Sequence, residues 1–160
     1  YKVPDWIVIP VGDGVILTGI YKAFLDLQRA GITQNLPHLL CVQAESSDAI
    51  TSYWEIGNYH DAENPVTIAD SIKVKTPALA HWSVKALKET DGKGIRVSDA
   101  EIQEAQLELA KYTGVFAEPS SSATWAGLKK TVTKRWVNAD SDIVLLITGH
   151  GLKDPGAVKL

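Results

Sequence analysis

The architecture of this chain is set by residues 7–19, which read Ile7-Val8-Ile9-Pro10-Val11-Gly12-Asp13-Gly14-Val15-Ile16-Leu17-Thr18-Gly19. An apolar run with the character of a strand stops at a Gly-Asp-Gly turn, and a helical pattern begins directly after it. Ile16, Ile20 and Phe24 recur at helical spacing and give that helix an apolar face. Its N-terminal N–H groups then face open space, which is the geometry of a phosphate-binding turn. Glycine also closes many such turns for steric reasons alone, so the turn by itself identifies no ligand.

Strand-like and helix-like segments alternate along the rest of the chain. This alternation is typical of βαβ units and predicts an α/β fold with three layers, in which a mainly parallel sheet has helices on both faces. The expected strands are Trp6–Pro10, Leu39–Ala44, Val115–Ala117 and a buried last strand, Ile143–Ile147. The expected helices run from Ile16 to a C-cap near Gly31, from Ser47 to Ile56, from Thr76-Pro77 to the turn at Asp91–Gly94, from Ser98 to Gly114, and onward from Pro119.

Local signals place one helix start and several buried faces. Ser98-Asp99-Ala100-Glu101 is a capping box, in which Ser98 and Glu101 each satisfy a backbone N–H group of the other. The segment from Gly57 to Pro65 is rich in polar and turn-forming residues and is expected to be a surface loop. The apolar residues expected on buried helix faces are Leu79, Trp82, Ala86, Ile102, Ala105, Leu109, Tyr112, Trp125, Leu128 and Val132.

The composition is that of an ordinary soluble protein. A chain of 160 residues suits one domain, 1–160, and can bury a sizeable core. Hydrophobic residues make up 45% of it, yet no apolar run approaches the about 20 residues that a membrane-spanning helix needs. The formal net charge of −3 gives no reason to expect a nucleic-acid partner, and Lys129, Lys130, Lys134 and Arg135 are expected to form a solvated helix face. Cys41 is the single cysteine, cannot form an internal disulfide, and suits a reducing cytoplasm.

Three passages together resemble one enzyme family. They are Pro10-Val11-Gly12-Asp13-Gly14 with the helix through Tyr21-Lys22-Ala23-Phe24, then Val115-Phe116-Ala117-Glu118-Pro119-Ser120-Ser121, then Thr148-Gly149-His150-Gly151-Leu152-Lys153-Asp154. The last passage is the most specific, because composition seldom places a glycine-flanked His and Leu-Lys-Asp directly after a strand. Over nearly its whole length the chain resembles the C-terminal half of threonine synthase, a pyridoxal-phosphate enzyme of the tryptophan-synthase-β-like fold, fold type II. The resemblance implies the C-terminal portion of a large cofactor-binding domain.

The resemblance implies how pyridoxal phosphate would be held. Helix N-terminal amides neutralise a phosphate dianion, and the backbones of Gly12, Asp13, Gly14, Val15 and Ile16 are placed to do so. The Asp13 carboxylate is expected to turn away, since it would repel a phosphate. Many family members carry Gly-Asn where this chain has Val15-Ile16, so only backbone contacts to phosphate are expected there.

Five further residues lie in the remaining two motifs. Thr148 follows the last strand where the family places a hydroxyl against the pyridine nitrogen, although a threonine there could simply cap the strand. Glu118 and Ser120 are candidates for lining the cofactor cleft, with helix capping by the serine as the equally weighted alternative. His150 is a further cleft candidate, for which a structural role is favoured. Lys153 belongs to the family's Gly-Leu-Lys-Asp pattern and is not expected to bind the cofactor.

The family's Schiff-base lysine lies in a Ser-Phe-Lys-Asp-like motif, and no lysine of this chain has such surroundings. The chain therefore resembles about half an enzyme, without the N-terminal half and the small domain. The resemblance implies a lyase of threonine biosynthesis that converts O-phosphohomoserine and water to threonine and phosphate when full-length, and an isolated chain that is inactive. The implied partners are that substrate, the N-terminal half and, as an open question, a second copy in a homodimer.

Other interpretations remain open from the sequence. A cysteate synthase or a threonine dehydratase would share the cofactor turn, and a non-catalytic remnant serving as an interaction module would share the fold. A dinucleotide-binding unit is disfavoured because the third glycine of Gly-x-Gly-x-x-Gly would fall on Leu17, although Glu45 could imitate its ribose-binding acid. His38, His60 and His81 lack the spacing of metal ligands, so no catalytic metal is expected.

Overall fold

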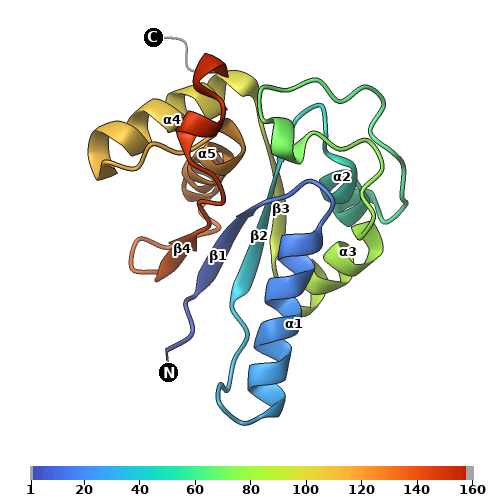
Figure 1. Ribbon diagram of the computed structural model, residues 1–160. Coiled ribbons are helices and arrows are strands. Elements are labelled where there is room, and N and C mark those ends of the chain that lie inside the picture. The colour runs from blue at the N-terminus through green and yellow to red at the C-terminus, as the bar shows by residue number, and fades with distance from the viewer. Residues whose placement is uncertain (1, 158–160) are drawn as a thin grey trace.

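The computed structural model describes residues 2–157, in which strands and helices alternate (Figure 1). The elements in chain order are β1 (Trp6–Pro10), α1 (Val15–Arg29), β2 (His38–Ala44), α2 (Ala49–Ile56), α3 (Ala80–Glu89), β3 (Lys93–Val97), α4 (Asp99–Thr113), α5 (Pro119–Thr133) and β4 (Ile143–Leu145). Short 3-10 turns are η1 (Asp70–Ile72), η2 (Gly151–Lys153) and η3 (Pro155–Ala157).

The strands form one sheet in the order β3-β2-β1-β4, and every pairing in it is parallel. Ile7 of β1 lies opposite Leu39 of β2 on one side and Val144 of β4 on the other. Helices α1, α2 and α3 cover one face, and α4 and α5 cover the other (Figure 1). The predicted three-layer α/β fold is thus confirmed.

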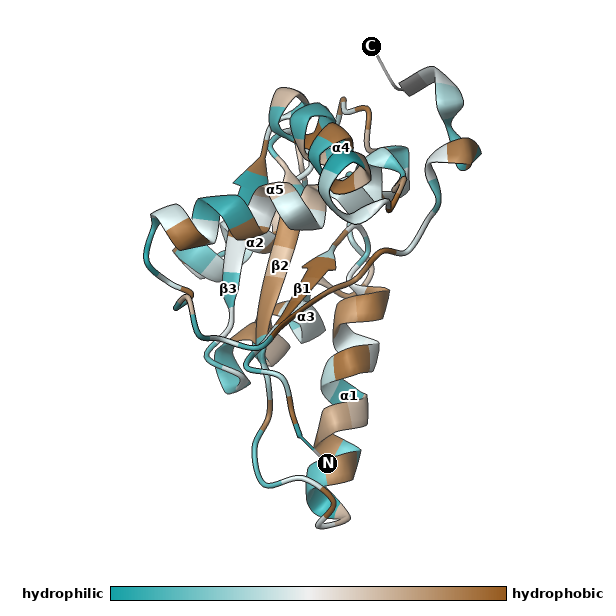
Figure 2. Ribbon diagram, turned by 90° about the vertical axis from the view of Figure 1, so that its left-hand side faces the viewer, coloured by the Kyte–Doolittle hydropathy of each residue, from teal (hydrophilic) through white to brown (hydrophobic). Residues whose placement is uncertain are grey.

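The side chains on the two faces of β1 and β2 pack into two separate hydrophobic cores. Val8 and Leu40 point into a cluster with α4 and α5, whereas Ile9 and Leu39 point into a cluster with α1, α2 and α3. All four side chains are fully buried, so each contributes about 1.5–3 kcal/mol by leaving water. Figure 2 shows most of both strands in the hydrophobic colours, the pattern of a parallel sheet covered on both faces.

One predicted strand is wrong and one strand was missed. Val115–Ala117 is not a strand, since Ala117 makes only an isolated antiparallel bridge to His150. The third strand is instead β3, Lys93–Val97, in a segment that the sequence argument treated as a helix-ending turn followed by a cap. Its Gly94 allows close packing, because a Cβ there would lie 3.0 Å from the Thr51 Cγ2 atom. Three of the five residues of β3 are a glycine or a charged residue, so this edge strand lacks the apolar run that would have predicted it.

Three side chains expected to be buried are exposed: Trp82 by 57%, Tyr112 by 68% and Val132 by 54%. The sheet covers only one side of each helix, and these residues lie on the far side; Trp82 packs under the Lys85 ammonium instead. The last strand is shorter than predicted and is not fully buried, with Val144 43% exposed, because β4 pairs only with β1 among the described residues.

Helix ends follow the local signals in part. The capping box of α4 is present, with the Ser98 Oγ accepting from the Glu101 N–H and the Glu101 carboxylate accepting from the Ser98 N–H at 2.7 Å. Helix α3 begins at Ala80 rather than at Thr76-Pro77. The turn before it is held by the β1–α1 loop, since the Leu79 N–H donates to the Asp13 carbonyl at 3.0 Å.

Candidate cofactor-binding site

The turn between β1 and α1 requires its two glycines. Gly14 caps α1 with a φ of +86°, in the left-handed region, and a Cβ there would lie 2.2 Å from the Ser83 Oγ atom. A Cβ on Gly12 would lie 2.9 Å from the Val74 Cγ2 atom and 3.1 Å from the Ile72 Cα atom. Both glycines are buried and neither position has room for a side chain, so glycine allows this turn to pack closely against its neighbours.

The amides of this turn lack protein acceptors. Among the described residues, no backbone or side-chain acceptor receives a hydrogen bond from the N–H groups of residues 12–17. The amides on either side are paired, since the Val11 N–H donates to the Val42 carbonyl at 2.9 Å and the Thr18 N–H donates to the Gly14 carbonyl at 3.0 Å. Unpaired N–H groups at a helix N-terminus carry partial positive charge and suit an anion.

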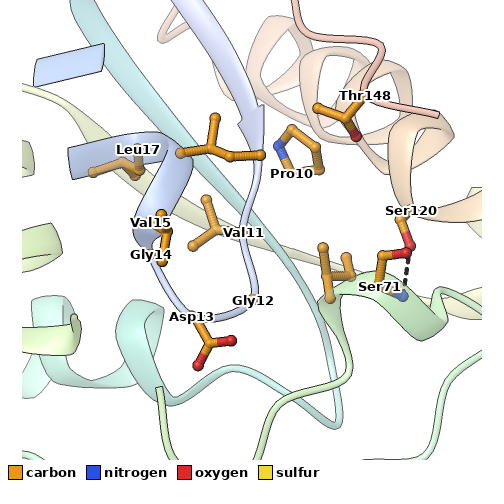
Figure 3. Close-up of a pocket in the computed structure, with 12 residues that line it drawn as sticks. Pro10, Val11, Gly12, Asp13, Gly14, Val15, Leu17, Ser71, Ser120 and Thr148 are labelled. Atoms are coloured by element: carbon orange, nitrogen blue, oxygen red, sulfur yellow. Dashed lines mark hydrogen bonds between the residues drawn. The ribbon is translucent and has the colours of Figure 1, made fainter. Parts of the chain in front are cut away.

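The Asp13 carboxylate points away from the unpaired N–H groups of the turn. Its side chain is exposed, its Oδ1 atom accepts a hydrogen bond from the Ala78 N–H at 3.3 Å, and Figure 3 shows it directed away from the cavity. The side chains of Val15 and Ile16 are 59% and 45% exposed. An anion at the turn would therefore meet backbone N–H groups and no facing carboxylate from Asp13.

A cavity of about 180 Å³ lies over the turn (Figure 3). It is found at the carboxyl ends of β1 and β4, where the strand order reverses: the chain goes from β1 outward to β2 and β3, then returns to the other side of β1. Ligands of open α/β sheets bind at such a reversal. The lining residues are Pro10, Val11, Gly12, Asp13, Gly14, Val15, Ile16, Leu17, Ser71, Ile72, Ser120 and Thr148.

Thr148 reaches the cavity from the chain that follows β4. Figure 3 shows it across the cavity from the β1–α1 turn. Its hydroxyl lies 3.1 Å from the Ser121 hydroxyl, and the N–H groups of Thr148 and Gly149 both donate to the Ser121 Oγ atom at 2.9 Å. Gly14 and Ser120, which lie 106 positions apart in the chain, thus meet at one cavity only through the fold.

The segment after Thr148 is docked tightly against the start of α5. The Glu118 N–H donates to the Gly149 carbonyl at 3.0 Å, and the Gly151 N–H donates to the Phe116 carbonyl at 2.8 Å. A Cβ on Gly149 would lie 2.1 Å from the Glu118 Oε1 atom, and one on Gly151 would lie 2.6 Å from the Phe116 ring. The two glycines around His150 are explained by this close approach.

Glu118 and Lys153 form an ion pair beside the cavity. Glu118 is only 4% exposed, and its Oε2 atom lies 2.9 Å from the Lys153 Nζ atom, which also donates to the Ser71 Oγ atom at 2.7 Å. Ser120 accepts a hydrogen bond from the Ser71 N–H at 3.1 Å. Glu118, Lys153, Ser71 and Ser120 line a second cavity of about 200 Å³, which shares the two serines with the first. At its rim, a hydrogen bond from Lys73 lowers the pKa of the Asp70 carboxyl.

His150 lines neither of these cavities. Its Nδ1 atom accepts a hydrogen bond from the Leu152 N–H at 3.1 Å, and its ring packs edge-on against Phe116 with centroids 5.7 Å apart. Among residues 2–157, no three His, Cys, Asp or Glu side chains are grouped as they would be to hold a metal ion. Within the same range, none of the helices has the length and apolar character that crossing a membrane requires.

Two serines of the site were not singled out from the sequence. Ser121 lies inside a quoted motif next to Ser120 and Ser122, and only its contacts distinguish it from them. Ser71 lies on η1, in a long irregular segment between α2 and α3 with no motif of its own. A signal for Ser121 was present as a run of three serines at a helix start, whereas Ser71 had none.

A parallel α/β fold with an anion-accepting turn after its first strand is typical of enzymes that bind a phosphorylated cofactor, and comparison with known sequences identifies the family. The chain belongs to the pyridoxal-phosphate dependent enzyme family, whose model matches residues 1–149. The resemblance noted in the sequence is confirmed, and the family is dependent on pyridoxal phosphate.

Curated relatives of this chain carry the name threonine synthase. The protein of Methanosarcina acetivorans is 40% identical over 99% of this chain and 40% of its own length. That of Methanocaldococcus jannaschii is 36% identical over 98% of this chain and 39% of its own length. The chain thus spans about 40% of the length of these relatives. A solved L-serine ammonia-lyase from Rhizomucor miehei matches 93% of this chain and 46% of its own with a TM-score of 0.73, and its 24% identity supports the fold alone.

Proposed function

We propose that this chain forms the phosphate-binding and ring-contacting part of a threonine synthase, which converts O-phosphohomoserine and water into threonine and phosphate. The proposal is supported by relatives of that name at 36–40% identity over nearly the whole chain. The structural observation that carries it is the row of N–H groups at residues 12–17 that have no acceptor within the described part of the chain.

The residues at the turn fit the phosphate of the cofactor. The N–H groups of Gly12, Asp13, Gly14, Val15 and Ile16 would donate to it, and a Cβ at either glycine would collide with the surroundings. Pyridoxal phosphate, when bound, supplies an electron sink for carbanions formed on an amino-acid substrate. This chain's share of the work is to hold the phosphate and to orient the ring.

Thr148 would contact the pyridine nitrogen of the cofactor with its hydroxyl. It lies across the cavity from the phosphate-binding turn, which is where a ring anchored by its phosphate would extend. Ser120 lines this cavity and Glu118 lines the adjoining one, which supports a role for both beside the cofactor. That His150 lines the cofactor cleft of the full-length enzyme stays a prediction.

A lysine for the reaction would come from outside these 160 residues. No lysine lines the first cavity in the part of the chain that the structure describes, and Lys153 in the adjoining one is held by Glu118 and Ser71. We therefore propose that the isolated chain has no threonine synthase activity, and that the N-terminal half of the enzyme supplies the lysine and most contacts to the substrate phosphate. A cytoplasmic location and a homodimer belong to the same proposal.

Two measurements test this function. Titration of the chain with inorganic phosphate should shift the amide resonances of residues 12–17 in a ¹⁵N NMR spectrum more than those elsewhere. The longest form of the protein that its gene encodes should release threonine from O-phosphohomoserine. If it instead forms cysteate from O-phosphoserine and sulfite, or 2-oxobutanoate from threonine, one of the alternative enzymes is supported. Binding of phosphate elsewhere, with no turnover of any of these substrates, would refute the proposal and favour an interaction module.

A further inference from the structure

The hydroxyl of Ser121 is the most heavily used hydrogen-bonding atom beside the cavity. Ser121 lies in the first turn of α5 and is completely buried. Its Oγ atom accepts from the Thr148 N–H at 2.9 Å and from the Gly149 N–H at 2.9 Å, and it lies 3.1 Å from the Thr148 hydroxyl. The neighbouring Ser122 is equally buried, but its hydroxyl donates to the Glu118 carbonyl within the helix.

The donor in the hydrogen bond between the Ser121 and Thr148 hydroxyls follows from the number of partners that Ser121 has. A serine hydroxyl has two acceptor positions and one proton. The N–H groups of Thr148 and Gly149 occupy both acceptor positions of Ser121, so its own proton is the one that remains for the Thr148 hydroxyl. Thr148 therefore accepts from Ser121 and keeps its own proton free to donate elsewhere.

We infer that Ser121 is a positioning residue, which makes the Thr148 hydroxyl a hydrogen-bond donor aimed at an unprotonated pyridine nitrogen. The inference rests on the proposed function, in which Thr148 contacts the cofactor ring. Within residues 2–157, no acidic side chain opposes it: Asp13 faces away from the cavity, and Glu118 is paired with Lys153 and lines only the adjoining cavity. The ring nitrogen would then meet a neutral donor and no carboxylate, and would stay unprotonated.

The test uses pyridoxal phosphate labelled with ¹⁵N in the ring, bound to the longest form of the protein that its gene encodes. The ¹⁵N chemical shift reports whether the ring nitrogen is protonated, hydrogen-bonded or free. In the unaltered protein we expect an unprotonated, hydrogen-bonded nitrogen. Ser121→Ala should move the shift toward that of Thr148→Val, which has no hydroxyl to donate. Ser122→Ala, the matched control in the same helix turn, should leave the shift unchanged.

Affinities separate positioning from a general loss of structure. Ser121→Ala should weaken binding of pyridoxal phosphate about tenfold, because two partly buried N–H groups and the Thr148 hydroxyl lose their partner. It should leave binding of inorganic phosphate unchanged within about twofold, because Ser121 is not among the residues that line the cavity over the β1–α1 turn. Combining Ser121→Ala with Thr148→Val should add no further change in the ¹⁵N shift.

The outcomes distinguish this inference from the proposed function. A ¹⁵N shift that is the same in Ser121→Ala as in the unaltered protein, or a protonated nitrogen in the unaltered protein, would overturn the role of Ser121. If Ser121→Ala does not fold, Ser121→Cys keeps the size but accepts hydrogen bonds weakly, and an unchanged shift in that variant would overturn it equally. The expected shifts without threonine formation would refute the proposed reaction and leave the role of Ser121 standing. No binding of pyridoxal phosphate at all would overturn both.

Discussion

Replacing Gly14 by alanine tests whether the β1–α1 turn needs glycine to keep its conformation and its close packing. The residue has a φ of +86°, and an added Cβ would lie 2.2 Å from the buried Ser83 Oγ atom. A left-handed conformation costs a residue with a Cβ about 1–2 kcal/mol, and overpacking adds about 1–3 kcal/mol. We expect Gly14→Ala to lower the free energy of unfolding by about 2–5 kcal/mol and to abolish phosphate binding at the turn.

Urea unfolding followed by circular dichroism measures the stability, and calorimetric titration measures phosphate binding. Gly19→Ala is the matched control in the same helix. A Cβ at Gly19 would meet nothing within 4 Å, so alanine there should stabilise the helix by about 0.5–1 kcal/mol. The Ser83 hydroxyl has no hydrogen-bond partner among the described residues, so Ser83→Ala should cost little by itself and should recover the overpacking part of the loss at Gly14. The reasoning is refuted if Gly14→Ala is as stable as Gly19→Ala or still binds phosphate normally.

Three further predictions concern other parts of the fold. Gly149→Ala should destabilise the protein by about 1–3 kcal/mol in urea unfolding, because its Cβ would collide with the Glu118 carboxylate, and an unchanged midpoint would contradict the close docking of this segment. Ser98→Ala should cost about 1 kcal/mol in the same assay by removing the capping box of α4, whereas no loss would mean that the cap contributes nothing. Burial raises the pKa of the Cys41 thiol from 9.0 to about 12, so iodoacetamide should label it only after unfolding. Since the folded state holds this proton more tightly, its contribution to stability is complete below pH 9 and should fall between about pH 9 and 12, and rapid labelling of the native protein at pH 8 would contradict this burial.

The sequence by itself determined the layers of this protein and the position of the β1–α1 turn. Apolar runs that alternate with amphipathic helices predict a covered parallel sheet, and β1 and β2 match their predicted ranges to within a residue. A Gly-Asp-Gly turn between a strand and a helix predicts unpaired N–H groups at a helix N-terminus, because chain geometry there is local. The capping box of Ser98 was readable for the same reason.

Features that depend on neighbours in space could not be read in this way. Strand β3 carries glycine and charge because it lies at a sheet edge, and Trp82 is exposed because the sheet covers only one side of α3. Ser71 and Ser120 meet only because η1 packs beside the start of α5. Three adjacent serines look alike in sequence, and the tertiary structure alone gives Ser121 its contacts with the chain after β4. Backbone turns and caps depend on residues close together in the chain and can therefore be predicted from the sequence. The pairing of a hydroxyl with an N–H group from a distant segment depends on how the segments pack.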